Sequence, residues 1–182
     1  MPNLRSLESR MIRAAKLDID FYEEVQADLS ANGQAFAAVT IASLATGLGT
    51  GYLSMITEDA PNFGIGLGLG FASSVIGWLA WVVLAYLLGT NLFKGSETTA
   101  TLGELIRTIG FANSPRVLGF LVFIPYLGWI VSLLVSVWAL IAGVIAIRQI
   151  LDITTWRSIG TCFLGWIGYQ LLLGIVLWII LA

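Results

Sequence analysis

A run of 31 residues without a charged side chain, Val117 to Ile147, constrains this chain more than any other feature. An uncharged run of this length is typical of a membrane-embedded segment. As one α-helix it would extend about 46 Å, whereas the hydrocarbon core of a bilayer is about 30 Å thick. Fitting such a helix by tilt alone would take about 50°, beyond the usual range of about 0 to 40°. We therefore expect two helices that fold back at a hairpin turn formed by Pro125 and Gly128.

The composition indicates a polytopic membrane protein. Of the 182 residues, 58% are hydrophobic and 11% are charged, whereas about a quarter of the residues in a soluble domain are charged. The net charge of −2 comes from 9 basic and 11 acidic residues, so the chain offers no basic surface for nucleic acid. We predict an all-α fold, a membrane helix bundle.

Chemically active residue types are scarce. The chain has no histidine, so it lacks the usual general base, proton shuttle and zinc ligand. Its one cysteine, Cys162, lies in an apolar segment, where we expect it to act as a small buried hydrophobe. The apolar segments show no ionisable residue and no paired acid and base. We expect no enzymatic activity, no cofactor and no metal site.

Residues 1–32 are predicted to form a cytoplasmic amphipathic domain, and residues 33–182 a transmembrane domain. The apolar positions between Leu4 and Leu29 recur about every 3.5 residues, which predicts one helix. Its basic first half suits contact with anionic lipid heads. Alternatively, its apolar stripe packs on the cytoplasmic face of the protein itself.

The transmembrane domain is predicted to contain about five membrane helices, one of them a short or bent arm of the hairpin. They cover about residues 34–56, 65–92, 116–126, 128–149 and 159–181.

Residues 101–112 form a further amphipathic helix, which we expect to lie in the membrane interface. Its apolar residues stand at helical spacing opposite Glu104, Arg107 and Thr108, and Thr101 with Glu104 matches a capping box. Pro115 ends it, because proline disfavours helical geometry at the preceding residue.

The distribution of Lys and Arg residues between the two sides of the membrane decides whether the chain crosses it four or five times. With the N-terminus inside, a hairpin at Pro125 leaves all nine Lys and Arg residues on the cytoplasmic side, whereas a single pass would place Arg148 and Arg157 outside. We therefore expect a multi-pass protein of the cell (plasma or inner) membrane, with a cytoplasmic N-terminus and an external C-terminus.

Two sets of residues are candidates for contacts. Glycines at the outer ends of the first two spans have the small-xxx-small spacing that lets helices approach closely, and they complete no nucleotide-binding motif. These helix-packing candidates are Gly47, Gly51, Gly64, Gly66, Gly68 and Gly70. Four tryptophans lie deeper than an interfacial aromatic belt requires. They indicate either helix packing or contact with a flat lipid or pigment: Trp78, Trp81, Trp138 and Trp166.

Four stretches resemble the Yip-domain membrane proteins, named for Ypt/Rab-interacting protein, and specifically their bacterial branch. They are residues 13–25, 110–116, 124–128 and 137–140, which read RAAKLDIDFYEEV, GFANSPR, IPYLG and VWAL. The resemblance implies five membrane helices, a cytoplasmic N-terminus and no established enzymatic activity. Eukaryotic relatives are associated with vesicle traffic and Rab GTPases, but no Rab-contacting motif matches residues here.

The sequence favours a non-enzymatic accessory or scaffold subunit that acts through helix packing with another membrane complex. We expect membrane lipids and a protein partner, either in a larger complex or in a homo-oligomer, and no nucleic acid. The alternative is a small permease or channel in which the Pro125 hairpin is a re-entrant element.

Overall fold

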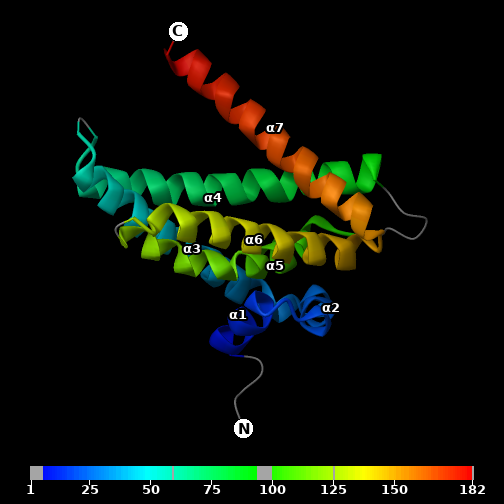
Figure 1. Cartoon of the computed structure of the whole chain (residues 1–182). Helices are drawn as coiled ribbons and strands as arrows, with labels where there is room; N and C mark the ends of the chain where they lie inside the picture. The colour runs from blue at the N-terminus through cyan, green and yellow to red at the C-terminus, as the bar shows by residue number, and fades with distance from the viewer. Residues whose placement is uncertain (1–5, 59, 94–99, 125, 182) are drawn as a thin grey trace.

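The computed structural model describes residues 6–58, 60–93, 100–124 and 126–181, with side chains as far as residue 171. The described chain is helical throughout and contains no strand, which confirms the all-α prediction (Figure 1). The N-terminal helices are α1 (Leu7–Ala15), α2 (Ile19–Ala27) and the short η1 (Leu29–Ala31). The bundle contains α3 (Asn32–Ile56), α4 (Phe63–Leu87), η2 (Leu88–Leu92), α5 (Leu102–Ala112), η3 (Ser114–Phe123), α6 (Gly128–Leu151) and α7 (Thr155–Leu181).

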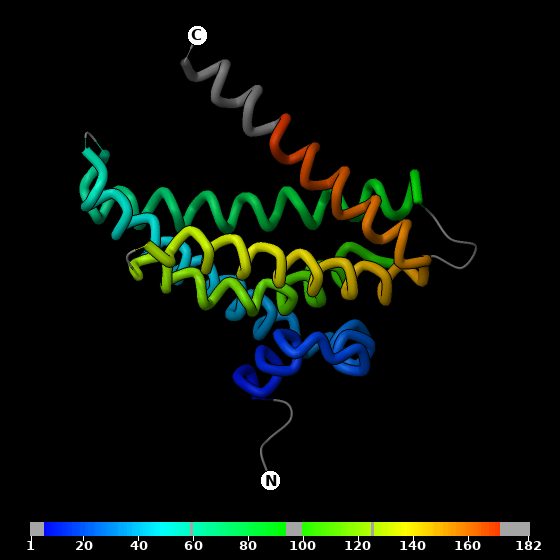
Figure 2. Tube along the Cα trace, viewed as in Figure 1, coloured from blue at the N-terminus to red at the C-terminus, as the bar shows by residue number. Residues whose placement is uncertain are grey.

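Three helical segments of the described chain are long and apolar enough to cross a bilayer. They are Leu29–Ile56, Phe63–Leu92 and Gly128–Leu151. The tube in Figure 2 shows that the turn after α3 and the turn before α6 lie at one end of the bundle. The start of α5 and the turn between α6 and α7 lie at the other end. The apolar helices are therefore joined alternately at two opposite ends.

The predicted hairpin is present, with η3 and α6 as its two arms. Pro125 lies outside the described residues, but the turn around it is constrained on both sides. Tyr126 has a φ of 63°, in the left-handed region that few residues other than glycine adopt. A Cβ at Gly128 would lie against the carbonyl oxygen of Val122, so only glycine fits where α6 begins. The first arm is a 3₁₀ helix, which at about 2.0 Å per residue extends about 20 Å.

The predicted helix at residues 101–112 is confirmed as α5, including its capping box, but its polar side is not exposed. The Thr101 side chain accepts a hydrogen bond from the Glu104 backbone N–H, and Glu104 bonds back to the Thr101 N–H. Leu105 and Ile109 are buried on one side, and Arg107 and Thr108 are buried on the other. Because both sides are covered by protein, α5 packs inside the bundle instead of lying alone in the interface.

Helix α5 continues into η3 with only a short break. The Asn113 side chain donates to the Ile109 carbonyl at 2.8 Å, and the Ser114 hydroxyl donates to the Phe111 carbonyl at 2.6 Å. The Ser114 bond satisfies the Phe111 carbonyl, which Pro115 leaves without a backbone donor because it has no N–H. The Asn113 side chain satisfies the Ile109 carbonyl, because the backbone N–H of Asn113 bonds to Gly110 instead. Together α5 and η3 extend about 36 Å, similar to the length of α6. The chain therefore runs through the bundle once in α5 and η3 and returns in α6.

The N-terminal region contains two helices where the periodicity predicts one. Leu17 has a φ of 62°, and the Leu17 and Asp18 N–H groups bond to the carbonyls of Ala14 and Arg13. This is the Schellman arrangement that ends a helix. Asp18 then caps α2 by accepting a hydrogen bond from the Phe21 N–H at 3.2 Å. A capping carboxylate at Asp18 is thus what interrupts the apolar stripe.

The apolar stripe of α1 and α2 packs on the protein itself, as one of the two alternatives predicted. Ala14, Phe21 and Val25 are fully buried against residues of α3, α5 and α6. The ring of Phe21 meets that of Phe111 edge to face, with centroids 5.3 Å apart. The N-terminal helices therefore belong to the same core as the bundle.

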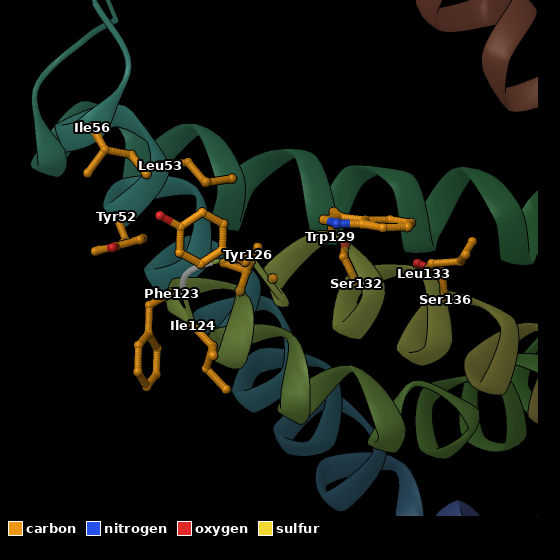
Figure 3. A pocket seen from close by; sticks show the side chains of 12 residues that line it. Tyr52, Leu53, Ile56, Phe123, Ile124, Tyr126, Trp129, Ser132, Leu133 and Ser136 are labelled. Atoms are coloured by element: carbon orange, nitrogen blue, oxygen red, sulfur yellow. The ribbon is translucent and has the colours of Figure 1, made fainter.

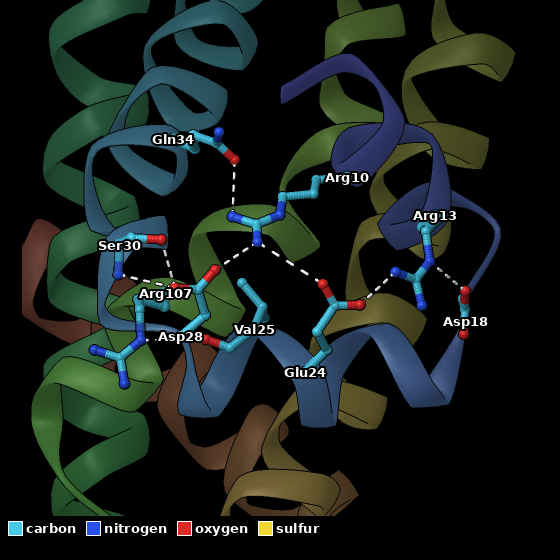
Figure 4. A network of polar contacts seen from close by, with 9 residues as sticks. All are labelled: Arg10, Arg13, Asp18, Glu24, Val25, Asp28, Ser30, Gln34 and Arg107. Atoms are coloured by element: carbon cyan, nitrogen blue, oxygen red, sulfur yellow. Dashed lines mark hydrogen bonds and ion pairs between the residues drawn. The ribbon is translucent and has the colours of Figure 1, made fainter. Parts of the chain in front are cut away.

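A polar network also fixes α1 and α2 to the bundle (Figure 4). Arg10 is buried and donates to Asp28 at 2.5 Å and to Gln34 of α3 at 2.9 Å. The Ser30 hydroxyl and the Arg10 guanidinium bond to the Asp28 carboxylate and lower its pKa to about 2. On the other side of α2, Arg107 donates to the carbonyls of Val25 and Gln26. Arg107 thereby satisfies carbonyls that the end of a helix leaves unpaired.

Candidate functional site

Several polar side chains inside the bundle line a pocket of about 640 Å³, here called the Arg116 pocket. Its walls come from α3, α4, α6, α7 and the junction of α5 with η3. The lining residues are Thr46, Ser73, Ser74, Gly77, Trp78, Trp81, Asn113, Arg116, Ser136, Val137, Ala139, Leu140, Val144, Ile159, Cys162, Phe163, Trp166 and Tyr169. A volume of this size is typical of small-molecule sites, which are mostly apolar with a few polar groups.

Arg116 is the only charged residue among those that line the pocket. It lies in the first turn of η3, about 20 Å along the chain from the start of α5. Arg10 and Arg13 form ion pairs with acidic residues of the N-terminal region, whereas Arg116 forms none within the described part of the chain. Its side chain keeps an exposed surface. The charge count in the sequence places Arg116 at the cytoplasmic end of the hairpin, whereas the structure places it beside the middle of α4 and α6.

Glycines on α4, α6 and α7 make room for the aromatic side chains of the pocket. A Cβ at Gly77 would lie 3.2 Å from the hydroxyl oxygen of Tyr169, and a Cβ at Gly165 would lie 3.3 Å from the Trp81 ring. A Cβ at Gly143 would also contact that ring. Helix α7 crosses α4 obliquely here (Figure 1). These glycines therefore let α7 come close enough to α4 to close one side of the pocket.

Trp78 contributes an unpaired donor. Its side chain is 5% exposed, and its indole N–H has no hydrogen-bond acceptor among the described residues. Buried indole N–H groups usually have a partner. Ser74, which also lines the pocket, accepts a hydrogen bond from Ser43 of α3 at 3.0 Å. Besides the Arg116 guanidinium, the polar side of the pocket thus consists of hydroxyl, amide and indole N–H groups, without any carboxylate.

Three of the four tryptophans predicted to contact a lipid or pigment lie together. Trp78, Trp81 and Trp166 line the Arg116 pocket. Trp138 lies apart from them, because its indole N–H donates to the Ala15 carbonyl at 2.8 Å and so fastens α1 to α6.

Four of the six predicted helix-packing glycines lie between α3 and α4. A Cβ at Gly47 would lie 2.8 Å from the Leu67 carbonyl oxygen, and one at Gly70 would lie 3.0 Å from the Gly47 Cα. Gly51 and Gly66 approach each other in the same way, with 3.1 Å from a Gly66 Cβ to the Gly51 Cα. The structure does not bring the other two to this contact.

Those two glycines, Gly64 and Gly68, lie on the outer side of α4. A Cβ at Gly68 would have no neighbour within 4 Å, and one at Gly64 would meet only the Asn62 side chain, at 3.5 Å. Both positions are exposed. Any role in packing would therefore involve a helix outside this chain.

A second pocket, of about 680 Å³, lies at the hairpin turn and is here called the turn pocket (Figure 3). Its walls come from the end of α3, the end of η3 and the first turns of α6. The labelled lining residues are Tyr52, Leu53, Ile56, Phe123, Ile124, Tyr126, Trp129, Ser132, Leu133 and Ser136. Ser136 lines both pockets, so the two cavities flank the same turn of α6.

Neither pocket has an Asp, Glu or His side chain in its lining. Among the described residues, no group of three His, Cys, Asp or Glu side chains could hold a metal ion. Cys162 lines the Arg116 pocket but is 1% exposed, as a small buried hydrophobe would be. The arrangement is suited to binding.

The sequence interpretation missed Arg116, Asn113 and Tyr169 as site residues. The predicted hairpin arm of residues 116–126 begins at Arg116, which the sequence interpretation counts only as a cytoplasmic charge flanking the uncharged run. A signal was nevertheless present: Arg116 is the only charge in the 40 residues between Arg107 and Arg148. Two full membrane passes need about 40 residues, so that interval is long enough for both arms with Arg116 inside.

Comparison with known families gives one match, which covers most of the chain. The model of the Yip1 domain matches residues 19–179. No curated protein and no solved structure matches the chain.

Proposed function

Because the chain belongs to the Yip1-domain family of membrane proteins, we propose that it is a non-enzymatic accessory or scaffold subunit of the bacterial-type branch. It acts by packing one of its helices against a transmembrane helix of a partner protein. The family is in general a non-enzymatic one. The two pockets, with no carboxylate in either lining, support binding over catalysis as well.

The outer face of α4 carries this proposal. Gly64, Gly68 and Ala72 are exposed at a spacing of four residues, beside the exposed apolar side chains of Ile65 and Leu69. Glycine inside a helix costs about 0.5–1 kcal/mol relative to alanine. The glycines at the α3 contact offset that cost by close packing, but Gly64 and Gly68 have no such contact within the described chain. A partner helix seated on this row would supply it.

Replacing Gly68 by leucine tests the proposal. The added side chain enters open space in this chain, so folding should be unaffected while close approach of a partner helix is blocked. We expect the wild-type chain to purify in mild detergent with a partner or a second copy, and Gly68→Leu to lose it. Val83→Leu is the matched control, because Val83 is an exposed apolar residue further along α4.

The identity of the co-purified species separates the two forms of the proposal: a different protein indicates an accessory subunit, and a second copy indicates a homo-oligomer. A strictly monomeric wild-type chain under several extraction conditions would contradict both. Equal recovery of the partner by Gly68→Leu would contradict the assigned face.

A small permease or channel is the second candidate, favoured by the two pockets that share Ser136. A solute path would run from the hairpin turn past Ser136 to Arg116. Reconstituted liposomes test it by uptake or conductance, with Ser136→Phe as the blocking variant. No flux across ions and common solutes would contradict this alternative.

For location, we propose the plasma or inner membrane with a cytoplasmic N-terminus and an external C-terminus. The excess of Lys and Arg near the start of the chain and at the end of α6 supports this orientation. Membrane lipids surround the apolar outer faces in that arrangement.

A further inference from the structure

The Arg116 pocket combines one cation with a long apolar wall, and these two features require different parts of a ligand. The cation is Arg116, whose guanidinium offers five N–H donors in a fork that suits phosphate or carboxylate. The wall is formed by side chains such as Trp81, Leu140 and Phe163. A small inorganic anion would satisfy the first feature and leave the second in contact with nothing.

The charge has no internal counterion. The lining residues include no Asp or Glu, and Arg116 forms no ion pair within the described part of the chain. Arg107, the other arginine of this segment, donates hydrogen bonds from all three guanidinium nitrogens, to Val25, Gln26 and Asn32. A cation inside a membrane bundle is costly unless it is paired, and such residues mark binding sites or pathways. Arg116 therefore needs an anion from outside the chain.

The pocket also faces the exterior on the side of α7. Phe163 and Trp166 both line the pocket and remain more than half exposed, at 57% and 53%. Their rings lie stacked, with centroids 6.4 Å apart. Tyr169, one turn further along α7, closes against α4 at Gly77. An apolar rim that is continuous with the outer surface of the bundle gives lateral access from a bilayer.

We propose that the Arg116 pocket binds an acidic membrane lipid, with the anionic headgroup on the Arg116 guanidinium and an acyl chain along the apolar wall toward α7. The Tyr169 hydroxyl and the Asn113 amide line the same pocket and can add hydrogen bonds to the headgroup. The proposal does not depend on the protein partner proposed for the outer face of α4. That face contacts a protein, whereas the Arg116 pocket contacts a lipid.

Native mass spectrometry of the full chain in mild detergent tests this site. The probes are phosphatidylglycerol and phosphatidylcholine with identical acyl chains, and inorganic phosphate alone. We expect the wild-type chain to retain phosphatidylglycerol about tenfold more than phosphatidylcholine, as one charge-assisted contact implies. Arg116→Gln should lose that preference, and Arg116→Lys should keep most of it because the charge remains.

Two controls separate the site from general effects. Arg148→Gln removes an equal charge from an exposed position at the end of α6 and should leave the preference unchanged. Leu140→Trp fills the pocket and should reduce retention of both lipids, with circular dichroism and elution volume reporting that the variant folds. Equal retention of phosphatidylglycerol by wild type and Arg116→Gln would overturn the proposal. So would an equal loss in Arg148→Gln, or displacement of the lipid by inorganic phosphate alone.

Discussion

At the scale of single residues, two arginines nine positions apart in the same segment have opposite environments. Arg107 is 4% exposed and donates to Val25, Gln26 and Asn32, so its charge is dispersed over three acceptors. Arg116 faces a pocket without a carboxylate. A buried charge is stable when hydrogen bonds compensate its desolvation, which holds for Arg107 within the chain itself. Arg107 is therefore a structural residue.

Replacing Arg107 by methionine should destabilise the protein by about 2 kcal/mol or more, because the carbonyls of Val25 and Gln26 lose their donor. The N-terminal helices should also become more sensitive to protease, since Arg107 joins α2 to α5. Unfolding in detergent and limited proteolysis measure the two effects. Arg148→Met, at an exposed position, should change stability by no more than about 0.5 kcal/mol. Equal behaviour of the two variants would show that Arg107 has no special role.

At the scale of helices, the first hairpin is held by glycines whose backbones touch. Gly47, Gly51, Gly66 and Gly70 form the contact between α3 and α4, and larger residues would separate the two helices. Along the same helix, Gly68 faces open space. The pairs Gly64/Gly68 and Gly66/Gly70 have the same small-xxx-small spacing, so the spacing alone does not show which pair is buried. The two pairs are offset by two residues and therefore face different sides of α4.

Substitution of Gly70 and Gly68 by alanine should therefore have opposite effects. In Gly70→Ala the new Cβ would lie 2.5 Å from the Thr50 hydroxyl oxygen and 3.0 Å from the Gly47 Cα. We expect a loss of about 1–3 kcal/mol from this overpacking. Gly68→Ala should be neutral or stabilise the chain by up to about 1 kcal/mol, because alanine favours the helix. Thermal unfolding of the two variants in the same detergent checks the difference, and a destabilised Gly68→Ala variant would contradict it.

At the scale of the whole molecule, α5 and η3 together form the partner of α6 in the central hairpin. The 3₁₀ geometry of η3 lengthens the rise per residue, so ten residues extend about 20 Å and bring the chain to the far end of the bundle. The hairpin turn around Tyr126 then lies at one end of α6 and Asp152 at the other. This arrangement decides which loops share a side of the membrane.

Cysteine labelling in intact cells tests that arrangement. Tyr126 is 94% exposed and Asp152 is also exposed, while the native Cys162 is buried and should react slowly. A membrane-impermeant maleimide should label Tyr126→Cys from outside and label Asp152→Cys only after the cells are opened. Labelling of both positions from the same side would show that α6 does not cross the bilayer.

Much of this architecture follows from the sequence because its signals are local. Uncharged length predicts α3, α4, α6 and α7, and Thr101 with Glu104 predicts the start of α5. The reversal near Pro125 follows from the length of the uncharged run, because a single helix of 31 residues does not fit a bilayer, together with the count of Lys and Arg residues on each side. The break between α1 and α2 does not follow from the sequence in the same way. The apolar periodicity predicts one continuous helix, whereas Asp18 caps the start of a second helix.

By itself, the sequence therefore determined a helical membrane protein, the positions of its apolar segments and its family resemblance, since hydrophobicity and turn residues act over short distances. Only the tertiary structure decided which side of each helix is covered. It placed Arg107 beneath α2, Gly68 on the outside and Arg116 in a pocket built from five elements. These placements depend on contacts between residues far apart in the chain, and helical spacing specifies a face without specifying what covers it.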